Sequence, residues 1–324
     1  MKRILGIGNA LVDVLTKVDN EQILSELHLP KGSMQLLSTE AYAEVTRRML
    51  ALPTKLTTGG SACNTLLALS HLDAPTGMIG KIGDDENGRF FASYFAQRGI
   101  STRLLHDSRP TGVASTFITP DGQRTFGTYL GAAARLTADE LQLAWFEGYD
   151  YFYIEGYLVQ NHDLVLRAIE LAHAAGCEVC LDLASYNIVE ADLDFFRALM
   201  PSIDIVFANE QEAQALTGLE ARAALDALAA TCHIAVVKIG KHGVWACHGT
   251  EVAHCQARDV PVVVDTTAAG DYFAAGFMHA LAAGEPLATC IARGSLLAGH
   301  IIEVVGTELP DATWQQLRLQ CGLA

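Results

Sequence analysis

Apolar residues recur along the chain in two patterns, as short continuous runs and as longer stretches in which they return every three or four positions. Continuous runs of this length predict buried strands, here at 3–7, 76–79, 151–154, 178–181, 203–207 and 235–239. The helical spacing predicts helices at 39–50, 61–72, 87–98, 163–174, 193–200, 210–216, 221–230, 271–282 and 286–302. Because strands and helices alternate, the pattern predicts an α/β fold with a mostly parallel sheet covered by helices on both faces.

One region departs from this alternation. Two strand-like runs, 112–119 and 124–130, are joined by the turn signal Pro120-Asp121-Gly122. With further extended segments at 11–18 and 33–37, they predict a small β-sheet at one edge of the core. Ligands of open α/β sheets bind beyond the carboxyl ends of the strands, so this sheet is placed to act as a lid. We find no internal repeat or linker and expect a single domain over 1–324.

Composition narrows the classes of partner. The chain has 37 acidic and 22 basic residues, a net charge of −15, which argues against binding to nucleic acid. No apolar run approaches the ~20 residues of a membrane span, and the N-terminus lacks the pattern of a signal peptide. We therefore expect a soluble, cytoplasmic protein. The eight cysteines are scattered, and the Cys177/Cys180 pair, inside an apolar strand, is typical of structural thiols.

The segment 265–271 carries the strongest candidate chemistry. Small residues lead to Asp271, and an apolar helical run follows. The amides of Ala268, Ala269 and Gly270 would converge at the start of this helix, where free amides and the helix dipole bind anions. Asp271 could then accept the proton of an attacking hydroxyl, so the pattern indicates phosphoryl transfer. Taken alone, an acid at the start of an apolar helix is more often an ordinary N-cap or first-turn residue, so the catalytic interpretation of Asp271 depends on support from the rest of the chain.

Two familiar nucleotide motifs are missing. Gly6 and Gly8 lack the third glycine of a dinucleotide fingerprint, because Leu11 stands at that position, and no Walker phosphate loop occurs. Asp13 follows within an apolar strand, where a carboxylate is costly unless it is paired or lies at a site. It could hold two vicinal hydroxyls of a sugar, or lie on an exposed strand face.

Gly59 and Gly60 form a second glycine-rich turn into a helix, and adjacent glycines allow a ligand to approach the backbone closely. Asn64 would present its amide one turn into that helix, able to donate and to accept. The alternative is an ordinary loop with Ser61 as the helix N-cap.

Two strand ends complete the candidates. Asn209 and Glu212 follow the strand at 203–207, where Glu212 could hold Mg²⁺ through water, although the same spacing is typical of a capping box. Lys238, Gly240 and Gly243 end the strand at 235–239 and could line a nucleotide phosphate or ribose. A plain hairpin turn is the alternative for the second segment.

Together these motifs resemble the ribokinase-like (PfkB) family of sugar and nucleoside kinases, and the resemblance covers nearly the whole chain. Segment 265–271 resembles that family's D-T-x-G-A-G-D signature, and the other matches are Gly59-Gly60 with Asn64 for the N-terminal glycine motif, 80–88 for G-x-x-G-x-D-x-x-G and 209–212 for N-x-x-E. The segments 6–13, 31–34 and 129–132 look closest to the bacterial adenosine-kinase-like branch.

The resemblance implies a ribokinase-like three-layer α/β/α core and ATP-dependent phosphorylation of a primary hydroxymethyl group, assisted by Mg²⁺. It makes Asp271 the base, with the amides of Ala268, Ala269 and Gly270 as anion hole and Arg124 reaching from the hairpin toward the transferred phosphate. The residues implied for acceptor binding are Asn9, Asp13, Gly59, Gly60 and Asn64. Those implied for ATP are Asn209, Lys238, Gly240, Gly243 and Thr266, with Glu212 on Mg²⁺ through water. Activation by a monovalent cation such as K⁺, near the carbonyls after a strand ending at Asp265, is left open.

Ala268 departs from the family signature, which has glycine at this position. An added methyl group is tolerable where φ is negative and is penalised where φ is positive. The activity could therefore be lowered, and a catalytically weak ligand-binding homologue is one alternative function.

The acceptor is the other open question. It is a nucleoside, adenosine or a related purine nucleoside, in the first hypothesis, and a sugar such as ribose or fructose in the second. A base would need apolar contacts from the small sheet, for which Met34, Leu36, Phe117 and Tyr129 are candidates, or these residues merely pack that sheet. Monomer and homodimer are both compatible with the sequence.

Overall fold

The computed structural model describes residues 1–121 and 123–323. Nine strands form a large sheet in the order β14-β13-β12-β11-β10-β9-β1-β5-β6, which is parallel apart from the antiparallel pairs β12/β13 and β13/β14. The strands are β1 (Ile4–Ile7), β5 (Thr76–Gly83), β6 (Ser101–Asp107), β9 (Tyr151–Glu155), β10 (Glu178–Asp182), β11 (Ile205–Asn209), β12 (Ile234–Lys238), β13 (Val244–His248) and β14 (Glu251–Cys255).

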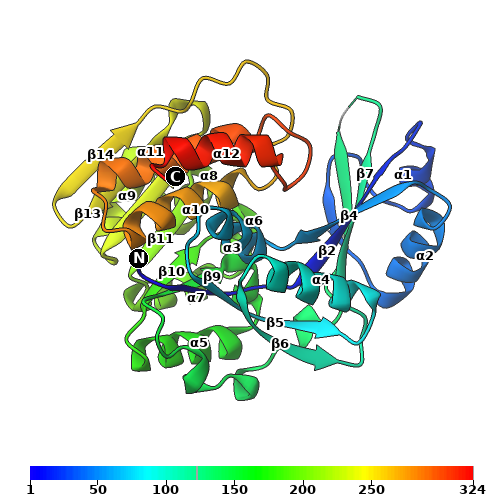
Figure 1. The fold of residues 1–324 in the computed structure, drawn as a ribbon, viewed down its shortest axis with the longest axis horizontal. Coiled ribbons are helices and arrows are strands. Elements are labelled where there is room, and N and C mark those ends of the chain that lie inside the picture. Colours follow the sequence, from blue (N-terminus) through cyan, green and yellow to red (C-terminus); the bar gives the residue numbers. More distant parts are fainter. Residues whose placement is uncertain (122, 324) are drawn as a thin grey trace.

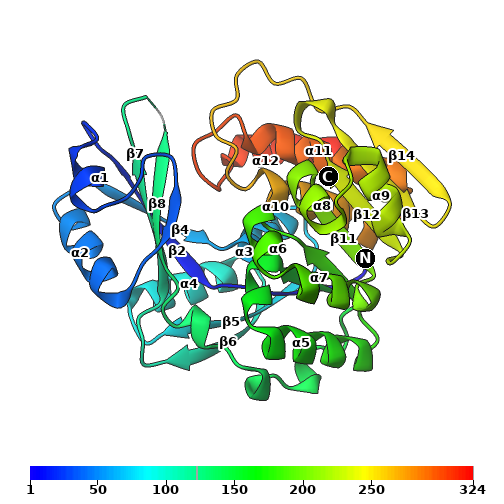
Figure 2. The same cartoon turned by 180° about the vertical axis from the view of Figure 1, so that it is seen from behind.

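Helices cover both faces of the large sheet, as the alternation predicts (Figures 1 and 2). One apolar layer packs α3 (Ser61–His71), α4 (Glu86–Gln97), α10 (Ala269–Ala282), α11 (Leu287–Ile301) and α12 (Asp311–Gln320). The opposite layer packs α5 (His162–Ala174), α6 (Tyr186–Ala191), α7 (Leu193–Leu199), α8 (Glu210–Thr217) and α9 (Ala221–Ala229). Phe207 on β11 meets Phe277 on α10 edge-to-face at 5.2 Å, and this contact fixes α10 to the sheet. The predicted three-layer α/β/α core is confirmed.

The small sheet stands to one side of this body (Figure 1). Its strand order is β3-β8-β7-β2-β4, so the extended segments predicted at 11–18, 33–37 and 112–130 do share one sheet. The strands are β2 (Leu11–Lys17), β3 (Met34–Leu36), β4 (Thr54–Gly59), β7 (Gly112–Ile118) and β8 (Arg124–Tyr129). The helices α1 (Gln22–Glu26) and α2 (Thr39–Met49) pack on it through a separate apolar cluster. Gly122, in the predicted hairpin turn, lies outside the described residues.

Short 3₁₀ turns make up the remaining elements: η1 (Ala133–Arg135), η2 (Ala138–Glu140), η3 (Leu143–Trp145), η4 (Gly156–Gln160), η5 (Met200–Ser202) and η6 (Gly240–His242). Among the described residues, no helix is both long and apolar enough to cross a membrane.

One predicted strand is wrong. The residues before Asp265 form no strand, and Val262, Val263 and Val264 are exposed by 65%, 55% and 45%. Asp265 instead continues an extended segment whose amides at 264 and 265 donate to the carbonyl of Ile302, beyond the end of α11. An apolar triplet therefore does not by itself mark a buried strand.

Candidate active site

Asp271 lies in the first turn of α10, and its carboxylate is held by the first turn of α3. Ser61 Oγ donates to Asp271 Oδ1 at 2.6 Å, and Asn64 Nδ2 donates to Oδ2 at 2.8 Å. Thr65 Oγ1 donates to the backbone carbonyl of Asp271 at 3.2 Å. The two helices begin at one place, so the carboxylate has a fixed position and orientation.

Burial raises the pKa of Asp271 to about 7. The hydrogen bonds from Ser61 and Asn64 lower this pKa, and the charges of Asp182 and Glu155 raise it further. A carboxylate that titrates near neutral pH is suited to accept a proton from an alcohol, because it is ionised in a large fraction of molecules and still basic.

The turn that precedes α10 provides free backbone donors. The N-cap of α10 is Ala268, with φ 61° and ψ 6°, and not Asp271. The amide of Ala269 donates to the carbonyl of Thr266 at 3.2 Å, whereas those of Ala268 and Gly270 have no hydrogen-bond partner among the described residues. Two of the three amides expected to form an anion hole are thus available in this structure.

Ala268 has the positive φ that glycine adopts without cost, so the methyl group departs from the family signature at a position where it is strained. A non-glycine residue in the left-handed region costs roughly 1–2 kcal/mol. The chain tolerates this cost at the start of α10.

Gly59 and Gly60 are required by close packing. A Cβ at Gly59 would lie 2.1 Å from Asp13 Oδ1, and a Cβ at Gly60 would lie 2.1 Å from the carbonyl oxygen of Asn9. Gly60, with φ 100°, is the N-cap of α3, so the alternative that assigned this role to Ser61 is wrong. The hydroxyl of Ser61 is free to bind Asp271 instead.

Asp13 on β2 is a second carboxylate whose pKa is raised by burial. Burial raises its pKa to about 7, the guanidinium of Arg124 lowers it, and the charge of Glu308 raises it. Arg124, the first residue of β8, pairs with Asp265 Oδ2 at 2.5 Å, and its Nη2 is buried without a partner. Asp265 also accepts from the amides of Thr267 and Gly306. The arginine thus joins the small sheet to the turn before α10.

Glu155, at the end of β9, is a site residue that the sequence reading missed. It is 1% exposed and accepts from the backbone and side-chain amides of Asn9, at 2.8 and 2.5 Å, and from the amide of Ala62 at 2.9 Å. It therefore fixes Asn9 and the first turn of α3, which carries Ser61 and Asn64. Its position at the end of an apolar strand is the feature of the sequence that could have identified it.

Lys238 and Asp182 form an ion pair beside the start of α10. Lys238 Nζ lies 3.3 Å from Asp182 Oδ2, and a Cβ placed on Gly270 would lie 3.4 Å from the same nitrogen. The charges of Asp182 and Glu212 raise the pKa of Lys238 against the effect of burial. Asp182, the last residue of β10, was also missed by the sequence reading.

Asn209 and Glu212 make the capping box that was the alternative to a metal site. Glu212 N donates to Asn209 Oδ1 at 2.9 Å, while Asn209 N and Nδ2 donate to the carboxylate of Glu212 at 2.7 and 2.6 Å. Glu212 is 3% exposed, and burial raises its pKa.

The remaining predicted ATP residues lie on turns. Gly240 and Gly243 belong to the tight connection between the antiparallel strands β12 and β13, which is the hairpin that was the alternative to a phosphate bed. Gly240 and Thr266 are exposed, whereas Gly243 is buried against the carbonyl of Cys255. Lys238 ends β12 and stands directly before this hairpin.

Of the four candidate base contacts on the small sheet, two are packing residues. Phe117 is fully buried in the cluster beneath α1 and α2, and the ring of Tyr129 stacks on Tyr42 with centroids 4.4 Å apart. Met34 and Leu36 on β3 are exposed by 48% and 56% and are free to contact a ligand.

Comparisons with known proteins extend over nearly the whole chain. The sequence model of the pfkB family carbohydrate kinases matches residues 39–314. A probable sugar kinase from Rhizobium etli CFN 42 is similar in structure, with TM-score 0.88, 31% identity and 100% and 99% of the two chains covered. An adenosine kinase from Sinorhizobium meliloti has TM-score 0.87, 32% identity and 99% of each chain covered. An adenosine kinase of Saccharomyces cerevisiae is 28% identical over 330 aligned positions, 94% of this chain and 96% of the yeast protein.

Proposed function

Because the chain belongs to the PfkB family of carbohydrate kinases, and is thus a phosphotransferase with an alcohol group as acceptor, we propose that it phosphorylates the primary hydroxymethyl group of a nucleoside. Adenosine or a related purine nucleoside is the acceptor and ATP is the donor. Two of the three proteins compared above, including one solved structure at 32% identity, are adenosine kinases.

The observation that carries the proposal is the position of Asp271 beside free amides at a helix start. Its carboxylate, with a pKa of about 7, accepts the proton of the attacking hydroxyl. The amides of Ala268 and Gly270 stabilise the charge on the transferred phosphoryl group, in the field of the α10 dipole. Base and anion site lie within one helical turn, so attack and charge stabilisation occur at the same point.

Two cations flank this point. Lys238 Nζ lies beside the α-carbon of Gly270 and contacts the phosphates of ATP, while its partner Asp182 keeps the ammonium in place. Arg124 stands next to Asp265 and retains one unpartnered nitrogen for a phosphate oxygen. Phosphoryl transfer has a loose transition state, so positioning and charge stabilisation of this kind account for most of the rate.

Mg²⁺ would be held by Glu212 through water, near Asn209. The donor set suits this cation, because a carboxylate and an amide oxygen are hard ligands and Mg²⁺ retains most of its water. When bound, Mg²⁺ supplies positive charge to the phosphates. In the ligand-free chain both oxygens of Glu212 accept from Asn209, and these bonds hold the carboxylate in one orientation. Activation by K⁺ is left open.

The acceptor lies between Asp13, Asn9 and the first turn of α3. Asp13 and the side-chain oxygen of Asn9, whose amide nitrogen is held by Glu155, accept from ribose hydroxyls. Asn64 offers its side-chain oxygen while its nitrogen binds Asp271. Met34 and Leu36 are exposed on the small sheet and contact the base.

A sugar kinase is the second candidate, since the Rhizobium etli protein, with the highest TM-score reported above, is a probable sugar kinase. Ribose or fructose needs the hydroxyl contacts of Asp13 and Asn9 but not the exposed Met34 and Leu36. The distinction between the two acceptors therefore rests on β3.

The test is ADP formation from ATP and Mg²⁺ with adenosine, inosine, guanosine, cytidine, ribose and fructose. Turnover with a purine nucleoside and not with free sugars supports the proposal. Turnover with a sugar alone would support the second candidate, a sugar kinase that uses the same catalytic residues. No turnover with any acceptor, by a folded protein that binds ATP, contradicts the proposal.

A further inference from the structure

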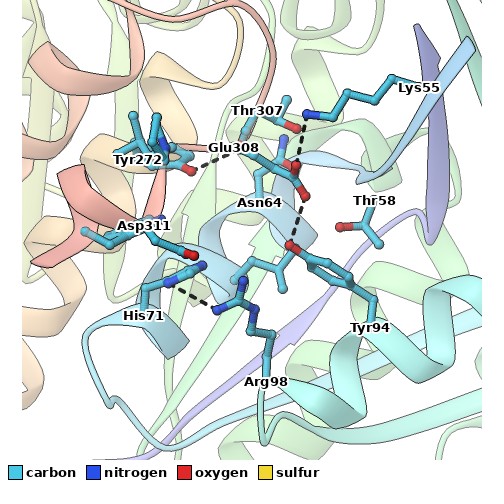
Figure 3. Close-up of a pocket in the computed structure, with 14 residues that line it drawn as sticks. Lys55, Thr58, Asn64, His71, Tyr94, Arg98, Tyr272, Thr307, Glu308 and Asp311 are labelled. Carbon is cyan, nitrogen blue, oxygen red and sulfur yellow. Dashed lines mark hydrogen bonds and ion pairs between the residues drawn. The ribbon is translucent and has the colours of Figure 1, made fainter.

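A cavity of about 330 Å³ lies between the edge strand of the small sheet and the core, on the side of α3 that faces α4 and α12 (Figure 3). Lys55 and Thr58 of β4 form one wall, and the segment from Thr307 to Trp314 forms another. An ion pair at 3.4 Å from Lys55 to Glu308 joins the two parts across it. Among the described residues that have a role in the proposed function, Asn64 is the one that also lines this cavity.

Two buried hydroxyls in this lining have no partner. Thr58 and Thr307 are 1% and 8% exposed, and the side-chain oxygen of each makes no hydrogen bond within the described chain. Buried polar atoms are bonded in the large majority of cases, and an unsatisfied one costs about 1–3 kcal/mol. Unpartnered hydroxyls in the wall of a cavity are the arrangement expected where a ligand supplies the missing partner.

Arg98 is a cation of this lining without an ion-pair partner among the described residues. Lys55, Glu308 and Asp311 are the other charged residues of the lining. Glu308 is paired with Lys55 and accepts a hydrogen bond from the hydroxyl of Tyr94 at 2.8 Å. Asp311 lies at ion-pair distance from neither cation of the lining. Arg98 contacts His71 Nδ1 at 3.4 Å and the ring of Tyr94, but no carboxylate of the described residues lies at ion-pair distance from it. Burial and the neighbouring guanidiniums lower the pKa of His71 to about 3, so the histidine is a neutral acceptor. A ligand group that pairs with Arg98 is therefore an anion.

An aromatic wall supplies the apolar part. The ring of His71 stacks on that of Trp314 with centroids 4.2 Å apart, and the ring of Trp314 stacks on that of Tyr272 with centroids 5.7 Å apart. Such a continuous stack favours a planar ring in the adjoining space. A volume of about 330 Å³ is within the usual range for a small-molecule site.

We propose that this cavity binds a small organic anion with a planar ring, either a carboxylate or a phosphate ester. The anionic group pairs with Arg98, the ring lies along His71 and Trp314, and Thr58 and Thr307 bond its polar atoms. Asn64 lines the same cavity and donates to Asp271, so the ligand also alters acceptor binding. This second part rests on the proposed function.

Binding is tested on the full chain without ATP or acceptor, so its result does not depend on kinase activity. Protein labelled with ¹⁵N in its tryptophans gives indole signals for Trp145, Trp245 and Trp314. It is titrated to ~10 mM, a range that covers weak binding, with 1-naphthoate and with 1-naphthyl phosphate. Naphthalenemethanol is the control without charge, and inorganic phosphate is the control without a ring.

The proposal expects one or both ring anions to shift the Trp314 signal saturably, and neither control to do so. Arg98→Met weakens this binding by about tenfold or more, while Arg89→Met, an exposed arginine on the same helix, leaves it unchanged. The unshifted signals of Trp145 and Trp245 verify that each variant is folded. The preferred probe distinguishes a carboxylate from a phosphate ester.

Absence of a Trp314 shift with both ring anions overturns the site, as does equal binding by Arg98→Met. Bound ligand that leaves the KM of the acceptor unchanged overturns the coupling through Asn64. If the ligand changes the KM of the acceptor equally in Arg98→Met, it acts by binding at the catalytic residues and not in this cavity. That result also overturns the proposal.

Discussion

The side chain of Asn64 donates from Nδ2 to Asp271 Oδ2 at 2.8 Å, across the gap between two helix starts 207 positions apart. This bond and the one from Ser61 lower the pKa of a carboxylate that burial raises. Asp271 consequently titrates at about 7, where a carboxylate is able to act as a base under neutral conditions. The alignment of α3 with α10 therefore sets both the position and the basicity of the carboxylate that we propose as the base.

Replacing Asn64 by alanine should shift the acid limb of the pH–rate profile to higher pH. The variant loses a hydrogen bond that lowers the pKa of Asp271, so the carboxylate stays protonated to a higher pH. We expect a shift of about one pH unit in kcat. Thr65→Val is the matched control, because Thr65 donates to the backbone carbonyl of Asp271 and not to its carboxylate. An unshifted limb for Asn64→Ala would disprove this assignment.

Asp271→Asn should stabilise the protein above neutral pH. A carboxyl whose pKa is about 7 in the folded state, against an ordinary value of 3.8, stabilises the folded state when protonated and loses that contribution as pH rises from about 4 to about 7. The neutral amide does not carry this cost, so we expect a gain of about 1–2 kcal/mol at pH 8 that disappears near pH 4. Urea unfolding at both pH values measures it. A gain of equal size at both would contradict the buried-charge explanation.

Ala268→Gly should raise stability and leave turnover equal or higher. Glycine adopts the φ of 61° at this N-cap without the penalty that a side chain incurs, and we expect a gain of about 1 kcal/mol in the free energy of unfolding. Ala269→Gly is the control, since Ala269 lies inside α10 and should lose about 0.5–1 kcal/mol. Thermal unfolding and kcat are the measurements. Equal losses in both variants would show that Ala268 is unstrained.

Glu212→Gln should raise the concentration of Mg²⁺ that half-saturates the reaction. The single oxygen of the glutamine amide can keep the bond from the backbone amide of Asn209, but the amide lacks the negative charge that attracts the cation, and we expect an increase of about tenfold. Glu210→Gln, an exposed acid one residue after Asn209, is the control. Identical Mg²⁺ curves for wild type and Glu212→Gln would contradict a role in Mg²⁺ binding and would show that this carboxylate acts only as part of the capping box.

The sequence predicted the core elements well because their signal is local. The buried strands β1, β5 and β9 to β12 are continuous apolar runs, and α10 is an apolar helix whose start is marked by Gly270 and Asp271. The edge strand β4 (Thr54–Gly59) was not predicted, because its sequence is mostly polar and half of it is exposed. The antiparallel strands β13 and β14 were not predicted, because the alternation of strands and helices along the sequence predicted a mostly parallel sheet.

The site was less predictable, because its contacts join distant segments. Glu155 reaches Asn9 across 146 positions, and Asp182 reaches Lys238 across 56, and neither acid belongs to a motif that would have marked it. Ala268 could be recognised as a departure from the family signature, but its positive φ follows from the packing of the turn and not from the residue itself. Sequence patterns identified the chemistry, and the fold supplied the residues that tune it.

The most direct test of the central claim is the turnover of Asp271→Asn with the best nucleoside acceptor, measured as kcat alongside the Kd for ATP. If Asp271 is the base, kcat falls by about two orders of magnitude or more while the affinity for ATP changes little. Turnover within about tenfold of wild type would contradict the account, because general-base removal costs more than that and the proton would then leave by another route.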